Sequence, residues 1–157
     1  MPWLLAIPML GGANGLRTMT PIAALCWFAY TGHLHVDGTW AFWLTNIISV
    51  IVFTLCALGE YIGDKLPQTP NRIAAGPLGA RIVFGGLVGA IVVTTLHQSL
   101  AAGILLGTIS AIAGAFLGFH LRRYLTVGRG LPDLPIALTE DGVTIALCAL
   151  ALSRLGA

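Results

Sequence analysis

Residues 100–121 read LAAGILLGTISAIAGAFLGFHL and contain no Lys, Arg, Asp or Glu. A helix needs about 20 mostly apolar residues to cross the hydrocarbon core of a bilayer, so this stretch is long enough to span a membrane. Over the whole chain of 157 residues, 57% are hydrophobic and only 9% are charged. Soluble domains carry about 25% charged residues. The sequence therefore predicts an integral membrane protein whose helices are surrounded by lipid.

Three further stretches are apolar enough to span, and they cover residues 40–59, 78–96 and 134–152. Residues 2–30 differ because prolines and glycines interrupt them, and these residues break or loosen helices. We expect a broken element here, in which the first segment spans, re-enters or lies at the interface. The sequence thus predicts an all-α fold, a polytopic membrane helix bundle of about five transmembrane helices in a single domain over residues 1–157.

The basic residues gather in two of the links between the expected spans. These residues are Lys65, Arg72, Arg122, Arg123 and Arg129. Positive charge marks cytoplasmic links, so we expect a multi-pass protein of a bacterial inner membrane, with its N-terminus in the cytoplasm and its C-terminus outside. No Lys or Arg precedes Arg17, so the positive start of a signal peptide is missing and we expect the first segment to be retained.

Two spans carry glycines four residues apart. The pairs are Gly85 with Gly89, Gly103 with Gly107, and Gly114 with Gly118. Small residues at this spacing, written GxxxG, allow another helix backbone to approach closely. The pattern predicts either close packing of these two spans within the chain or a seam between copies in a homo-oligomer.

Ionisable residues near the inner ends of the spans are the candidate ion- or substrate-binding residues. They are Arg17, Glu60, Asp64, Arg72, Arg81, Glu140 and Asp141. An ionised group inside a membrane is costly unless it is paired or hydrated. One hypothesis is a hydrated site in which Glu60 and Glu140 bind a cation or proton. The other is that Arg17 with Glu60, and Arg81 with Glu140, form structural ion pairs.

Other positions carry weaker signals. We expect Asp64 and Lys65 to be solvated at the interface, and Arg72 either to bind an anionic group or to lie in a stiff proline-rich linker. His33, His35 and Asp37 alternate in an outer loop, but this spacing is weak support for a metal site, and we expect none.

Several classes of function are not indicated. The sequence has no nucleophile motif, phosphate-binding loop or zinc-protease pattern, so we expect neither an enzyme nor a cofactor. A net charge of +2 is too small to indicate nucleic-acid binding. The cysteines, Cys26, Cys56 and Cys148, lie far apart in apolar runs, and we expect no disulfide.

Residues 57–72 read ALGEYIGDKLPQTPNR and are followed at 77–81 by PLGAR. This pattern, together with Arg17, Thr20-Pro21 and Glu140-Asp141, resembles a family of small bacterial membrane proteins that is catalogued only as a domain of unknown function. The resemblance covers most of the chain. It implies a multi-span inner-membrane protein and brings no established activity with it.

The first functional hypothesis is a small transporter or channel-like protein that moves an ion or small solute, coupled to protons through buried carboxylates. Five short spans enclose little volume, so a homodimer would help to build a pathway. The alternative is a non-transporting scaffold or accessory subunit that binds a partner through its Gly-rich helix faces. A weaker third hypothesis is a lipid-processing enzyme that uses Glu60, Asp64 and Arg72.

Overall fold

A computed structural model describes residues 3–66 and 73–155 of the chain. The elements in order are α1 (Trp3–Leu16), α2 (Thr20–Tyr30), the 3-10 helix η1 (Phe42–Thr45), α3 (Ile47–Gly63), α4 (Ala75–Thr95), α5 (Leu100–Arg123), the π-helical turn η2 (Tyr124–Gly128) and α6 (Asp133–Ser153). The described residues form helices and no strands, which confirms the all-α bundle. Arg72 lies outside the described residues.

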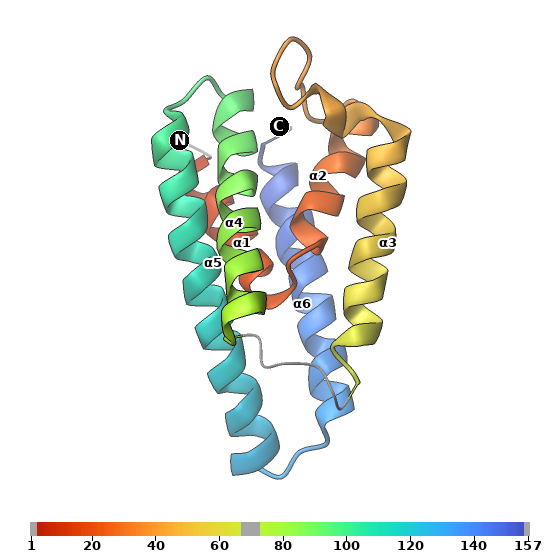
Figure 1. Cartoon of the computed structure of the whole chain (residues 1–157), viewed down its shortest axis with the longest axis vertical. Coiled ribbons are helices and arrows are strands. Elements are labelled where there is room, and N and C mark those ends of the chain that lie inside the picture. Colours follow the sequence, from red (N-terminus) through yellow and green to blue (C-terminus); the bar gives the residue numbers. More distant parts are fainter. Residues whose placement is uncertain (1–2, 67–72, 156–157) are drawn as a thin grey trace.

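Helices α1 and α2 form a hairpin inside the bundle (Figure 1). The chain enters α1 at the end that carries the α4–α5 turn, reverses over residues 17–19, and returns in α2 to the end where it started. The two helices have 14 and 11 residues, which at 1.5 Å per residue is about 21 Å and 17 Å. Each is shorter than the hydrocarbon core of about 30 Å, so neither helix is long enough to cross such a core by itself.

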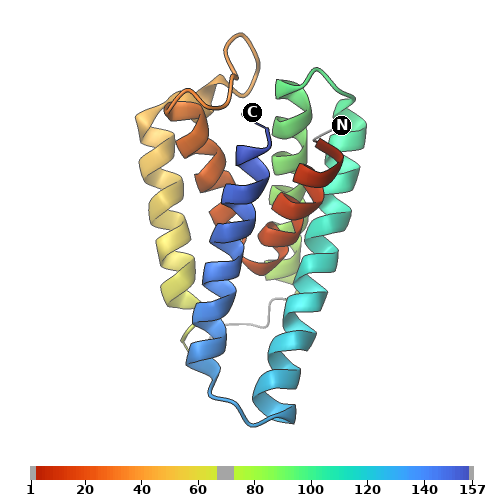
Figure 2. The same cartoon turned by 180° about the vertical axis from the view of Figure 1, so that it is seen from behind.

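The hairpin changes the topology that the sequence suggested. Because α1 and α2 together return to their starting end, α1 begins and α6 ends at the same end of the bundle, as both views show (Figures 1 and 2). The expected arrangement, in which the two ends of the chain lie on opposite sides, therefore does not describe this fold. The break expected in this stretch lies at residues 17–19, because α1 continues as one helix through Pro8 and the glycines up to Gly15.

Among residues 3–66 and 73–155, three helices are long and apolar enough to cross a membrane: α4, the continuous stretch Leu100–Gly128, and α6. They coincide with the expected spans 78–96, 100–121 and 134–152. The expected span 40–59 is divided, because the side chain of Asn46 accepts a hydrogen bond from the Ile48 N–H and starts α3 there. Helix α3 then continues to Gly63, and its 17 residues extend about 26 Å.

The outer surface of these helices is apolar. Leu55 on α3 is 62% exposed, and Leu105 and Leu117 on α5 are 62% and 70% exposed. Further exposed large apolar residues lie on all four long helices. Water disfavours a continuous apolar surface of this extent, whereas a surrounding bilayer accommodates it.

Glycines bring α1, α4 and α5 together backbone to backbone. A Cβ atom on Gly89 would overlap the carbonyl of Gly103, and one on Gly107 would overlap the carbonyl of Gly85. Further along α5, a Cβ on Gly114 would overlap the carbonyl of Gly12 on α1. These glycine pairs thus lie in interfaces within the chain.

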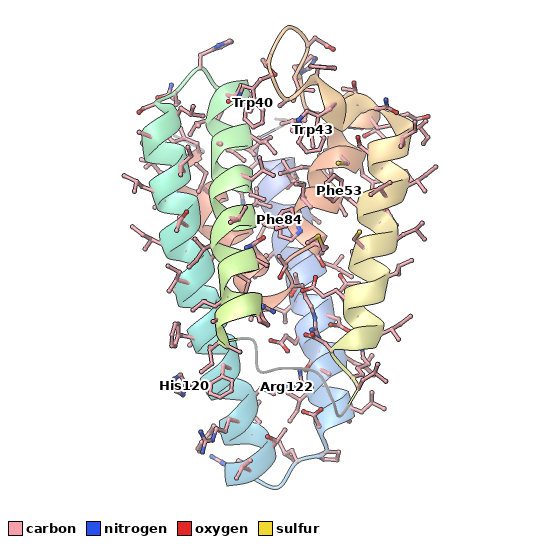
Figure 3. The ribbon with its side chains drawn as sticks, viewed as in Figure 1. Trp40, Trp43, Phe53, Phe84, His120 and Arg122 are labelled. Carbon is pink, nitrogen blue, oxygen red and sulfur yellow. The ribbon has the colours of Figure 1, made fainter. Side chains whose placement is uncertain are left out.

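Larger side chains join the remaining elements. Trp43 of η1 packs against Phe53 of α3, with ring centroids 5.8 Å apart, and Trp27 of α2 donates from Nε1 to Thr54 Oγ1 at 3.0 Å. Trp40 and Trp43 lie near one end of the bundle, whereas His120 and Arg122 lie near the other (Figure 3). Helix α6 lies between the glycine-packed helices and the α2–α3 pair (Figure 2).

The glycine packing makes a testable prediction. Gly89→Ala should lower the free energy of unfolding by about 1–3 kcal/mol, because the added methyl group forces two tightly packed backbones apart. The control is Gly79→Ala on the same helix, where a Cβ would meet no atom within 4 Å. Denaturant unfolding in detergent measures both variants. Equal stability of Gly89→Ala and Gly79→Ala would contradict the close approach.

Candidate functional site

The turn of the hairpin lies among charged side chains from α3, α4 and α6. The end of α3 and the beginnings of α4 and α6 meet at the same end of the bundle as this turn (Figure 1). We call the resulting group the charge cluster. It consists of Arg17, Glu60, Asp64, Lys65, Arg81, Glu140 and Asp141. Six of its seven residues were predicted as candidate site residues, and Lys65 is the addition.

Arg17 sits at the turn and its side chain is completely buried. Its Nε donates to Oδ1 of Asp141 at 2.7 Å, and its Nη1 pairs with Asp64. Its Nη2 lies 2.7 Å from Asp141 Oδ1 and 4.0 Å from Glu140 Oε2. The contacts of Nη1 and Nη2 lack hydrogen-bond geometry and are ion pairs. Only the Nε of Arg17 makes a directional hydrogen bond, to Asp141. A guanidinium without water is costly, and three carboxylates offset that cost.

The carboxylate of Glu60 accepts hydrogen bonds from two backbone N–H groups in the turn between α1 and α2. Its Oε1 accepts from the backbone N–H of Thr18 at 2.7 Å, and its Oε2 accepts from the backbone N–H of Met19 at 2.8 Å. Met19 provides no side-chain cap for α2. The N-terminal end of a helix leaves N–H groups unpaired and carries partial positive charge. The carboxylate of Glu60 therefore accepts the hydrogen bonds that a capping side chain or water would accept at the start of a surface helix.

Arg81 donates a hydrogen bond to a backbone carbonyl at the end of α1, just before the same turn. Its Nε donates to the Gly15 carbonyl at 2.9 Å, and its Nη2 lies 3.9 Å from Glu60 Oε1. In return, Asn14 Nδ2 donates to the Arg81 carbonyl at 2.8 Å. The C-terminal end of a helix carries partial negative charge, which a cation stabilises. Glu60 thus binds the start of α2, Arg81 binds the end of α1, and the two side chains also attract each other.

Lys65 extends the cluster towards α3. Its Nζ donates to Asp141 Oδ2 at 2.8 Å and to the Tyr61 carbonyl at 2.9 Å. The Tyr61 hydroxyl and Thr20 Oγ1 lie 2.8 Å apart and share a hydrogen bond. The expectation that Asp64 and Lys65 are merely solvated is wrong, because their side chains are only 17% and 25% exposed and both form ion pairs.

The partners within the cluster differ from the predicted ones. The sequence suggested that Arg17 pairs with Glu60 and Arg81 with Glu140. Instead, Glu60 faces Arg81, while Arg17 faces Asp141 and Asp64. The difference arises because the hairpin directs the Arg17 side chain towards α6 and leaves the turn's own backbone amides for Glu60.

Besides Lys65, two residues next to the charge cluster were not predicted as site residues. Arg122 donates to both carboxylate oxygens of Asp133, at 2.8 Å and 2.7 Å, and its Nη1 lies 3.7 Å from Glu140. Asn14 is completely buried, and its Oδ1 has no hydrogen-bond partner in the described part of the chain. An asparagine inside an apolar helix is a readable signal, because an unpaired amide in such a place costs about 1–3 kcal/mol.

A family model described as Domain of unknown function (DUF4126) matches residues 4–154. The chain belongs to this family. The predicted resemblance to a family of unknown function is thereby confirmed. No curated protein and no solved structure matches the chain.

The described residues also bear on metal binding. Within residues 3–66 and 73–155, no group of three His, Cys, Asp or Glu side chains is placed to hold a metal ion. In the loop between α2 and η1, His33 Nδ1 lies 2.9 Å from Thr31 Oγ1, and its ring packs edge-on against Phe28. The carboxylates of the charge cluster face Arg, Lys and backbone amide groups.

The burial of Arg17 makes a prediction about stability. Arg17→Gln should lower the free energy of unfolding by about 3–5 kcal/mol, because Asp141 and Asp64 lose a buried positive partner. The comparison variant is Arg122→Gln, whose partner Asp133 has a side chain that is 56% exposed, so the loss should stay within about 1 kcal/mol. Unfolding in detergent measures both. Wild-type stability in Arg17→Gln would show that the charge cluster does not hold the hairpin.

Proposed function

We propose that this protein is a small membrane transporter or channel-like protein that moves a proton or another small cation, with the charge cluster as its binding site. The observation that supports this most is the gathering of three carboxylates, from Asp64, Glu140 and Asp141, around the buried guanidinium of Arg17, with Glu60 on the adjacent backbone amides. Glu60 and Asp64 come from the end of α3, and Glu140 and Asp141 from the beginning of α6. Five of the chain's six acidic residues belong to α6 or the end of α3, and the sixth is Asp37.

A purely structural role explains such a cluster less well. Ionisable groups within a membrane are costly and commonly mark the paths of ions or protons. Replacing a buried ion pair with apolar residues of similar volume is often neutral or stabilising, so packing alone does not require these charges. Retaining seven ionisable residues in one place is better explained by a task that uses their charge.

The short hairpin also supports transport. In many transporters, helices that end within the membrane direct their ends at ions or substrates. Here the beginning of α2 faces the carboxylate of Glu60, and the end of α1 faces the guanidinium of Arg81. Because these contacts lie at helix ends, they can exchange partners without breaking a continuous helix. That is a property which a gated ion site needs.

The arrangement of charge favours a cation over an anion. Asp141 and Asp64 pair with Arg17, and Glu60 faces Arg81. An anion would have to displace fixed carboxylates from these arginines. A proton or cation would instead compete with Arg and Lys for carboxylates already present in the site. Arg17 and Arg81 then balance charge when the cation leaves.

The scaffold hypothesis loses part of its support. It relied on Gly-rich helix faces for a partner, and these faces are covered within the chain by α1, α4 and α5. We retain the homodimer as part of the proposal, because one small bundle encloses little volume for a pathway.

We further propose that the protein lies in a bacterial inner membrane with its basic end in the cytoplasm. That end carries Arg122, Arg123 and Arg129, and positive charge is enriched on cytoplasmic links. Since α1 begins and α6 ends at the opposite end of the bundle, both would then face outward. This orientation reverses the cytoplasmic N-terminus suggested by the sequence.

Cation flux into liposomes tests the proposal. Purified protein is reconstituted with a pH-sensitive dye inside, and a proton gradient is applied with a potassium-selective ionophore present to balance charge. Glu140→Gln and Glu60→Gln should each reduce the flux to that of protein-free liposomes, because each removes a negative charge from the site. Asp37→Asn, at an exposed position in the outer loop, should keep the wild-type flux.

Folding must be separated from transport, because Glu60 also holds the hairpin turn. Gel filtration and unfolding of each variant in detergent provide this control. A folded Glu140→Gln variant with full flux, or wild-type protein without flux of protons, sodium or potassium, would contradict the proposal.

A further inference from the structure

The basic end of α5 carries arginines of two kinds. Arg122 points towards α6 (Figure 3) and forms a two-bonded pair with Asp133. Its charge is therefore neutralised within the bundle. Arg123 and Arg129 are exposed, and neither has a carboxylate within 4 Å among residues 3–66 and 73–155. Their two positive charges remain available to something outside the protein.

Arg129 is held in place without losing its charge. Its guanidinium lies 5.5 Å from the centroid of the Tyr124 ring, and its Nε donates to the Tyr124 hydroxyl at 3.1 Å. An aromatic face orients a cation but does not neutralise it. The π-helical turn η2 separates Arg123 from Arg129 and has Tyr124 as its first residue, so the ring and both guanidinium groups belong to one end of the helix.

Exposed apolar side chains occur at the same end of this helical stretch. Leu117, Leu121 and Val127 are 70%, 53% and 77% exposed. The continuous helical stretch Leu100–Gly128 has 29 residues and extends about 44 Å. The hydrocarbon core is only about 30 Å thick. The end of α5 projects beyond α4 (Figure 1), and its excess length over the core would let this end reach the lipid head groups.

We propose that Arg123, Arg129 and Tyr124 bind the phosphate head group of an anionic phospholipid, whose acyl chains lie on Leu117, Leu121 and Val127. A lipid provides negative charge and apolar surface next to each other, which matches the arrangement of residues here. Free phosphate would satisfy the arginines but leave the apolar residues uncovered. This proposal is independent of transport, because none of these residues belongs to the charge cluster.

Lipid titration tests the site. Purified protein in a neutral detergent is titrated with dioleoylphosphatidylglycerol or with dioleoylphosphatidylcholine, and bound lipid is counted by native mass spectrometry. The wild type should prefer the anionic lipid. Each arginine removed should weaken its binding about fivefold, and the double variant Arg123→Gln/Arg129→Gln should weaken it about thirtyfold. Binding of the zwitterionic lipid should change little.

Two further variants separate lost charge from lost structure. Arg123→Lys/Arg129→Lys keeps both charges and should keep most of the preference for the anionic lipid. Arg154→Gln removes an exposed arginine beyond the other end of the bundle and should leave the preference unchanged. Raising the salt concentration should weaken the preference of the wild type, because the contact is electrostatic.

Three results would overturn the proposal. The first is equal binding of the two lipids by the wild type. The second is an unchanged preference in a folded Arg123→Gln/Arg129→Gln variant. The third is inorganic phosphate displacing the anionic lipid at similar concentration, which would identify a site for a free anion without a contribution from the acyl chains.

Discussion

The fold depends on how the turn between α1 and α2 is satisfied inside an apolar bundle. A reversal of the chain at this depth leaves amide N–H groups, a carbonyl and the guanidinium of Arg17 without water. Lipid offers no replacement partners. Glu60 accepts from the amides, Arg81 donates to the Gly15 carbonyl, and Asp141 pairs with Arg17. The end of α3 and the beginnings of α4 and α6 must therefore meet at this turn.

The helices form two groups that differ in the contacts that join them. Glycines join α1, α4 and α5 backbone to backbone, which allows little rearrangement. The carboxylates come from the other elements, α3 and α6, and they face Arg17 in the turn, Arg81 on α4 and Arg122 on α5. Attraction between charges thus adds to the apolar packing that holds α3 and α6 against the rest of the bundle. A change in the charge of these carboxylates would act directly on the contact between the two parts, and this connects the fold to the proposed cation transport.

The sequence predicted the parts of this fold that depend on composition. Apolar length located α4, α5 and α6, and the cost of ionised groups in a membrane selected six of the seven residues of the charge cluster. It did not predict the partners of Arg17, because they depend on the direction of the hairpin. The prolines and glycines of the N-terminal stretch did not locate the turn either, because Pro8 and Gly15 lie inside α1 and the chain reverses only after Leu16. The sequence also did not predict that Arg122 pairs with Asp133 while Arg123 is exposed. The two arginines are adjacent in sequence, and only their positions around the helix distinguish them.

The most direct test of the hairpin is to find on which side of the membrane each of its two ends lies. Single cysteines at Trp3, Thr31 and Gly130, in a variant without Cys26, Cys56 and Cys148, are exposed to a membrane-impermeant maleimide in intact cells and in inverted vesicles. The account predicts that Trp3→Cys and Thr31→Cys react from the same side of the membrane, the outer side in the proposed orientation, and that Gly130→Cys reacts from the opposite side. Reaction of Trp3→Cys and Thr31→Cys from opposite sides would mean that residues 3–30 cross the membrane and would contradict the account.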